Sequence, residues 1–131
     1  MKFRDEYWFL SNMYPCDCTF NGIKFTCSES LFQALKCTKV SDMKKFEGLD
    51  GRSAKKLGRE IKLRDDWNTY RLKAMRLALE VKFGRNPELR TLLKETAPLE
   101  LVEDNTWGDK FWGRSSGIGE NHLGKLLMEL R

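Results

Sequence analysis

Apolar residues recur at three- and four-residue steps in two stretches of the chain, which is the spacing of one face of an α-helix. The first stretch runs from Asp66 to Phe83, and its apolar stripe consists of Trp67, Tyr70, Ala74, Leu77, Ala78 and Val81. The second begins at Asn121, and its stripe consists of Leu123, Leu126, Leu127 and Leu130. The pattern predicts a long amphipathic helix over residues 66–83 and a shorter one at the end of the chain.

Residues that start and stop helices predict shorter helices elsewhere. Ser28 is a suitable N-cap, and Glu29 after it suits the positive end of a helix dipole. Ser53 is a second N-cap residue, and Asn86 is a third, followed by Pro87 at the first helical position. The predicted helical ranges are 28–38, 41–46, 53–59 and 87–95.

Strand patterns are few and short. Residues 18–25 alternate about Asn21-Gly22, a pair that favours the positive φ angles of a type I′ turn, so two short hairpin strands are predicted. Residues 99–103, Leu-Glu-Leu-Val-Glu, alternate as a strand does. These patterns together predict an α+β fold, mainly helical with a small antiparallel sheet, and argue against a doubly wound α/β fold.

Length and composition predict a single domain over residues 1–131. A chain of 131 residues, 40% of them hydrophobic, can bury roughly two-thirds of its unfolded surface. No apolar run approaches the roughly 18 residues of a membrane helix. Residues 1–6 contain acidic as well as basic side chains and lead into no signal-peptide core. We therefore expect a cytoplasmic protein with no membrane partner.

The charge balance narrows the class of ligand only slightly. Lys and Arg number 24 against 19 Asp and Glu, for a net charge of +5. This excess suits an anionic ligand such as a nucleotide, a sugar phosphate or a nucleic acid, although it is also common on ordinary protein surfaces. No predicted helix carries a dense basic face, so sequence-specific nucleic-acid binding has little support.

The scarcity of histidine limits the available chemistry. His122 is the only histidine, and the spacing of Cys16, Cys18, Cys27 and Cys37 matches no common zinc motif. We therefore expect no metal and no cofactor, and interpret the cysteines as reduced, partly buried thiols. Catalysis would then depend on carboxylates, lysines and ordered water.

One face of the helix predicted over 28–38 could carry such chemistry. Glu29, Phe32, Gln33 and Lys36 stand at positions i, i+3, i+4 and i+7, which share a face. In an aromatic cleft, Glu29 could act as a general base and a desolvated Lys36 as a nucleophile. The alternative is a solvated amphipathic helix in which Lys36 extends to water.

The loop over 105–113 is rich in aromatic residues. Trp107 and Trp112 flank Asp109 there, and Gly108 allows a close backbone approach. Exposed indole rings can stack on a nucleobase or ribose, and Asp109 could activate water. In the alternative, Trp107 and Trp112 pin the loop to the core and Asp109 caps a turn.

Two further segments could hold a phosphate. Residues 117–124 run into a predicted helix N-terminus, where backbone N–H groups suit an anion, but they lack the dinucleotide-binding glycine pattern. Residues 54–59 end in Arg59, whose guanidinium can bind a phosphate with two hydrogen bonds. The alternatives are a capping or packing role for His122 and a charged surface helix.

Together, these segments resemble the NADAR family, the YbiA-like N-glycosidases, over nearly the whole chain. The resemblance rests on segments in family-like order: 9–15, the 18–25 hairpin, 28–36, 54–59, 66–67, 82–83, 86–87, 101–103, 107–109 and 117–131. It implies hydrolysis of the bond between a ribose and a nitrogen base or amine. Family members act on phosphoribosylamino-pyrimidine intermediates of riboflavin synthesis, and others remove ADP-ribose from guanine in nucleic acid.

The resemblance also implies particular site residues. Glu29, Lys36 and Asp109 fall on acidic and lysine positions of the family motifs, and we expect them to be catalytic. The residues expected to contact the ligand are Asn12, Arg59, Trp67, Trp107 and Asn121. Ser30 replaces the usual family histidine and Met13 the usual phenylalanine.

Two mechanisms and two other functions remain open from the sequence. Lys36 could capture the opened glycosylamine as a Schiff base while Glu29 moves protons, or Glu29 or Asp109 could activate water. The expected partner is a small phosphoribosyl or ADP-ribosyl compound. The alternatives are ADP-ribosylated nucleic acid as the substrate and a module that binds ADP-ribose without cleaving it.

Overall fold

The protein is described by a computed structural model that covers residues 1–131. The chain divides into two compact units, Asn12–Asn86 and the combination of Met1–Ser11 with Pro87–Arg131. Each unit has its own helices, and the single domain predicted over 1–131 remains a prediction. No helix combines the length and apolar composition needed to span a bilayer.

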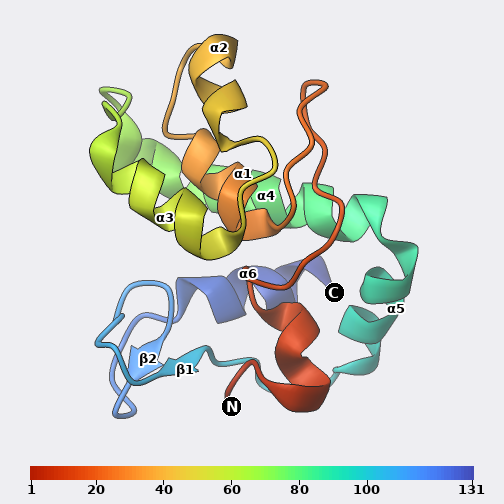
Figure 1. Cartoon of the computed structure of the whole chain (residues 1–131). Helices are drawn as coiled ribbons and strands as arrows, with labels where there is room; N and C mark the ends of the chain where they lie inside the picture. The colour runs from red at the N-terminus through yellow and green to blue at the C-terminus, as the bar shows by residue number, and fades with distance from the viewer. The chain divides into compact units, whose positions relative to one another are not determined.

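The unit Asn12–Asn86 begins with a non-helical segment, residues 12–27, and its remaining residues form helices joined by short connections. It contains α1 (Ser28–Ala34), α2 (Val40–Met43), the 3₁₀ helix η2 (Lys44–Phe46), α3 (Gly51–Glu60) and α4 (Trp67–Arg85). Helix α1 packs against both α3 and α4, and every one of its residues is buried (Figure 1). The side chains of α1 are therefore placed by contacts on several sides.

The second unit holds the remaining elements. They are the 3₁₀ helix η1 (Asp5–Leu10), α5 (Pro87–Glu95), β1 (Asp104–Asn105), β2 (Arg114–Ser115) and α6 (His122–Leu130). Strand β1 pairs with β2 in parallel, with Asp104 opposite Arg114. Leu93, Leu101 and Leu127 are almost fully buried and belong to the core.

The α+β, mainly helical fold is confirmed, but the predicted antiparallel sheet is wrong. The two strands run parallel, and the segment 99–103 is not a strand. Leu101 and Val102 are buried in succession, without the alternation that a half-exposed strand requires. Asn121 takes the place of a strand partner, since its Nδ2 donates to the Leu101 carbonyl at 3.0 Å and its Oδ1 accepts the Glu103 N–H at 3.0 Å.

The predicted hairpin over 18–25 is confirmed only at its turn. Asn21 and Gly22 have φ angles of 51° and 74°, as a type I′ turn requires. Phe20 and Ile23 exchange two backbone hydrogen bonds of 3.0 Å, but they form an isolated bridge and not two strands.

Most predicted helices are present, with differences at their ends and faces. Helix α1 begins after Cys27 and ends at Ala34, so Ser28 is its first residue and not its cap. Asp50 caps α3, accepting the N–H of Ser53, which had been predicted as the cap. The predicted stripe on α4 is only partly correct, because the buried residues are Ala74, Met75, Ala78, Leu79, Lys82 and Phe83.

Candidate functional site

A buried carboxylate lies in the first turn of α1. Glu29 is 8% exposed, and its Oε2 accepts a hydrogen bond of 2.7 Å from Gln33 Nε2, one helical turn later. The Glu29 N–H donates to the Asn12 carbonyl at 3.0 Å, which ties the start of α1 to the preceding loop. The carboxylate is therefore held by its own helix in a fixed orientation.

Lys36 follows α1 in a turn of the chain, on the side facing α3. Its Nζ donates to the Gly58 carbonyl at 3.5 Å and lies 5.8 Å from the centre of the Trp67 ring. Burial lowers the pKa of Lys36 below its usual value, and the Glu29 carboxylate opposes that shift. Positive charges on Arg59 and Lys55 lower this pKa further. Both α3 side chains therefore act electrostatically on the amine.

Aromatic rings lie beside this amine. Trp67, the first residue of α4, packs against Phe32 at a ring-centre distance of 5.3 Å and against Tyr70 at 6.4 Å. The guanidinium of Arg64 stacks on Tyr70 at 3.7 Å. Trp67 is partly exposed, so its ring is available to a ligand as well as to its neighbours.

Helices α1 and α3 approach closely because residue 58 is glycine. A Cβ atom built on Gly58 would lie 1.9 Å from Gln33 Oε1 and 3.4 Å from Lys36 Nζ. Gln33 Oε1 is buried and has no hydrogen-bond partner. The side chain that orients Glu29 is thus confined by the α3 backbone.

Asn12 and Arg59 occupy different environments, although both are predicted to contact the ligand. Asn12 is buried; its Oδ1 accepts from Ser28 Oγ at 2.8 Å, and its Nδ2 lies 3.3 Å from Met75 Sδ. Its side chain thus fixes the start of α1 within the unit. Arg59 is exposed on α3 and contributes positive charge near Lys36.

The other predicted residues belong to the second unit. Asp109 Oδ1 accepts the N–H groups of Phe111 at 3.0 Å and Trp112 at 2.9 Å, so it caps a turn, as the alternative interpretation held. Trp107 is 62% exposed and does not pin the loop to the core. Asn121 is buried, and both ends of its carboxamide hold residues 101–103.

The structure thus brings Glu29, Lys36, Trp67 and Arg59 together in one unit, whereas Trp107, Asp109 and Asn121 belong to the other. His122 packs against Phe111 at a ring-centre distance of 4.5 Å. No group of three or more His, Cys, Asp or Glu side chains is arranged to hold a metal ion.

One buried cation was not anticipated. Lys82 on α4 is fully buried, with its Nζ 5.3 Å from the Phe83 ring and 5.8 Å from the Tyr14 ring. The signal available in the sequence is a lysine at helical spacing from Ala78 and Leu79, both of which are buried.

Comparisons with known proteins agree on one relationship. The family model for the NADAR domain matches residues 1–131. The chain is 37% identical to the N-glycosidase YbiA of Escherichia coli over 131 residues, which cover 97% of this chain and 81% of that protein. It is 36% identical to a riboflavin biosynthesis protein of Vibrio vulnificus, covering 97% of this chain and 35% of that one. The NMR structure of E. coli YbiA superposes with a TM-score of 0.86 and 36% identity, covering 100% of this chain and 80% of the other.

Proposed function

The chain belongs to the NADAR domain family, and from this premise we propose that it is an N-glycosidase, a hydrolase of the bond between a ribose and a nitrogen base or amine. The observation that carries the proposal is the pairing of a buried, oriented Glu29 with Lys36, whose pKa is lowered by burial. A carboxylate and an amine whose pKa is lowered can share the proton transfers and the nucleophilic step of such a reaction.

Glu29 acts as the proton carrier in this proposal. Gln33 Nε2 occupies one lone pair of Oε2 at 2.7 Å, which orients the carboxylate. A carboxyl in a buried site can give a proton to the leaving nitrogen and then take one from the attacking group. Gln33 is accordingly a positioning residue.

Lys36 supplies the nucleophile in the preferred route. The glycosylamine opens to an imine, the neutral Lys36 amine adds to C1, and the nitrogen base leaves with a proton. Water then adds to the Lys36 imine, which releases the sugar and restores the amine. In the rival route, Glu29 or Asp109 removes a proton from water, which attacks an oxocarbenium-like C1.

The proposed substrate is a phosphoribosylamino-pyrimidine of riboflavin synthesis. The name of the Vibrio vulnificus relative supports that class. The positive charges of Lys55 and Arg59 beside Lys36 suit a phosphate on the sugar, and the Trp67 ring suits a planar base. The roles expected of Trp107 in stacking on the ligand and of Asp109 in activating water stay predictions, because both residues belong to the other unit.

The decisive experiment is incubation with two substrates, a phosphoribosylamino-pyrimidine and ADP-ribosyl-guanosine, with mass spectrometry of the released base and sugar. We expect the free aminopyrimidine and ribose phosphate from the first. If the protein cleaved only ADP-ribosyl-guanosine and released ADP-ribose, the proposed substrate would be ADP-ribosylated guanine. Saturable binding without any product would identify a binding module and overturn hydrolysis.

Variants test the assignment of residues. Glu29→Gln and Lys36→Ala should lower the rate by about 10²–10⁴ while the protein remains folded, and the exposed Glu60→Gln and Lys56→Ala on α3 should not. Wild-type rates in the first pair would show that the site is wrong. Borohydride should trap the sugar on Lys36 in the wild type, and absence of that adduct would favour direct water attack.

A further inference from the structure

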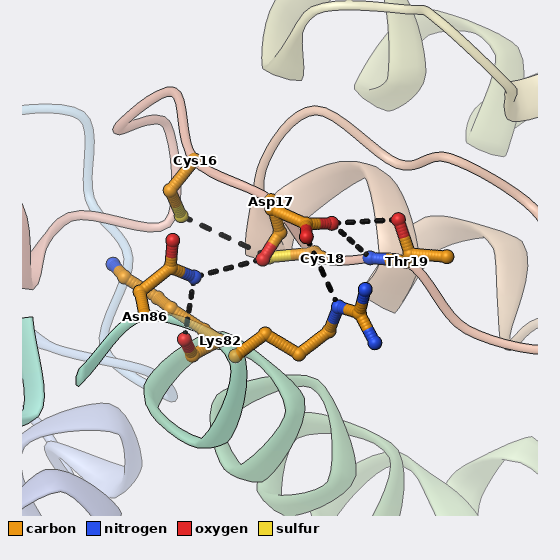
Figure 2. Close-up of polar contacts among 7 residues, drawn as sticks. Cys16, Asp17, Cys18, Thr19, Lys82 and Asn86 are labelled. Atoms are coloured by element: carbon orange, nitrogen blue, oxygen red, sulfur yellow. Dashed lines mark hydrogen bonds and ion pairs between the residues drawn. The ribbon is translucent and has the colours of Figure 1, made fainter.

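Two cysteines lie in contact on the segment that precedes the Asn21-Gly22 turn. The Sγ atoms of Cys16 and Cys18 are 3.8 Å apart. Figure 2 draws this contact as a dashed line. Cys16 is partly exposed, whereas Cys18 is fully buried. An accessible thiol beside a sheltered one is the arrangement in which the first can react with a small molecule and the second can resolve the product.

The residue between the cysteines is held in place by four hydrogen bonds. Asp17 Oδ1 accepts from the Thr19 N–H at 2.9 Å and from its hydroxyl at 2.6 Å. Asp17 Oδ2 accepts from Arg85 Nε at 3.1 Å, and the Asp17 carbonyl accepts from Asn86 Nδ2 at 2.8 Å (Figure 2). Because Asp17 is fixed to the end of α4, the two thiols are kept together and little backbone freedom remains to be lost on joining them.

A surface pocket gives access to the exposed thiol. It has a volume of about 510 Å³ and is lined by Cys16, Asp17, Thr19, Lys24, Phe25, Thr26 and Arg85. That volume is within the range of small-ligand sites. Asp17 pairs with Arg85 at 3.1 Å, so the Lys24 ammonium and the Thr19 and Thr26 hydroxyls are the groups that suit an anionic, hydrogen-bonding molecule. None of these lining residues belongs to the proposed hydrolytic site.

We propose that Cys16 and Cys18 form a thiol–disulfide exchange site, which reacts with a small anionic disulfide of the glutathione type bound in this pocket. The Cys16 sulfur, as its thiolate, attacks one sulfur of the bound disulfide and releases one small thiolate, which takes up the proton that Cys16 lost. The Cys18 sulfur then attacks the Cys16 sulfur of the mixed disulfide and releases the second small thiol with the Cys18 proton. Two protein thiols are thereby oxidised to one disulfide, and one external disulfide is reduced to two thiols.

The surrounding charges support this division of roles. The hydrogen bond with Cys16, together with burial, strongly raises the pKa of Cys18, so Cys16 is the attacking group. The Lys82 ammonium opposes that rise and favours a thiolate at Cys18 when it must attack. The thiols also act on Lys82, because Cys16, Cys18 and Cys27 each favour the charged form of its amine.

Peptide mapping after treatment with oxidised glutathione tests the proposal without any hydrolase assay. Cleavage after Arg4, Lys24 and Lys36 places Cys16 and Cys18 on one fragment, 5–24, and Cys27 on another, 25–36. We expect fragment 5–24 to lose two hydrogens, and dithiothreitol to restore them. A link between the two fragments, a stable glutathione adduct at Cys16 or an unreacted fragment would each overturn the exchange site.

Variants separate the two steps. Cys18→Ala should stop the reaction at a glutathione adduct on Cys16, and Cys16→Ser, at a partly exposed position, should abolish the reaction in a folded protein. The matched control is the double variant Cys27→Ser/Cys37→Ser, which should still oxidise at Cys16–Cys18. If the control fails to oxidise or Cys16→Ser still reacts at Cys18, the assignment is wrong.

Two disulfide probes of opposite charge test whether the pocket prefers an anionic ligand. At low salt, oxidised glutathione should react about tenfold or more faster than cystamine, a cationic disulfide, and Lys24→Ala should narrow that ratio. Equal rates for the two probes would overturn the anionic ligand class.

Discussion

The unit Asn12–Asn86 contains two lysines whose pKa is lowered by burial, and their surroundings differ in what can reach them. Lys36 is partly exposed, beside the Glu29 carboxylate and the Trp67 ring. Lys82 is fully buried, beside thiols and the rings of Tyr14 and Phe83. Burial lowers the pKa of both amines, but only the Lys36 side chain is partly exposed to solvent, whereas Lys82 has no exposed surface.

The difference shows that a lowered pKa alone does not identify a catalytic amine. Desolvation acts on any buried ammonium, whether or not a ligand can approach it. What distinguishes Lys36 is access together with an oriented acid, since Gln33 holds Glu29 by a 2.7 Å hydrogen bond. Lys82 has instead a thiol environment, which suits the exchange chemistry proposed for Cys16 and Cys18.

Replacing each lysine by methionine should have the largest effect and should separate the roles of Lys36 and Lys82. Lys36→Met should lower kcat/KM for the glycosylamine by about 10²–10⁴ and change the free energy of unfolding by less than about 0.5 kcal/mol, because its Nζ makes one long hydrogen bond. Lys82→Met should keep kcat per folded molecule. Product release and urea unfolding measure the two quantities, and a loss of kcat in Lys82→Met equal to that in Lys36→Met would invalidate the distinction.

The pH dependence of stability should separate Lys82 from its neighbours. Burial lowers the pKa of Lys82 from 10.5 to about 8. Below pH 8 both the folded and the unfolded chain bind the proton, so the cost of burying the charge is fully present. Between pH 8 and 10.5 the unfolded chain alone binds it, so this contribution to stability rises with pH. The wild type should therefore gain up to about 3 kcal/mol relative to Lys82→Met across that window.

The comparison with Lys82→Met removes titrations that do not depend on Lys82. Burial raises the pKa of Cys37, so this thiol lowers stability as pH rises, in the wild type and the variant alike. Urea unfolding of the two proteins at a series of pH values gives the difference directly. A difference that stays constant from pH 7.5 to 10.5 would show that burial does not lower the pKa of Lys82.

Sequence reasoning predicted the Lys36 region better than the Lys82 region, for a physical reason. The approach of Glu29, Gln33 and Lys36 depends on spacing within one helix and its following turn, which a local pattern contains. Lys82 is buried near the Tyr14 ring and interacts electrostatically with Cys16 and Cys18, which stand far earlier in the chain, and no local window contains them.

The same limit explains the strand error at 99–103. Asn121 satisfies that segment's backbone groups from another part of the chain, so the local alternation did not lead to strand pairing. The capping role of Asp109 was predicted only as an alternative. The Phe111 and Trp112 N–H groups that donate to its carboxylate are local in the chain, whereas a catalytic role would depend on groups elsewhere in the sequence.

Alanine substitutions at two glycines test whether the close packing of α1 against α3 constrains the Lys36 region. Gly58→Ala should destabilise the protein by about 1–3 kcal/mol and lower kcat, since the new Cβ would lie 1.9 Å from Gln33 Oε1. Gly84→Ala in α4 is the matched control, because nothing lies within 4 Å of its added Cβ. This control should gain about 0.5–1 kcal/mol of stability from its helix propensity. Equal effects of the two substitutions in urea unfolding would rule out a packing constraint at Gly58.

The smallest expected effect concerns the positive charge that surrounds Lys36. Arg59 lowers the pKa of Lys36, so Arg59→Ala should raise that pKa and move the rising limb of the kcat/KM profile to higher pH. Arg52→Ala, at an exposed position two turns earlier on α3, should leave the limb in place. Because Arg59 is exposed, 1 M salt should remove most of the difference between Arg59→Ala and the wild type. If Arg59→Ala moved the rising limb to lower pH, or if Arg52→Ala moved it by the same amount, Arg59 would not control the pKa of a nucleophilic Lys36.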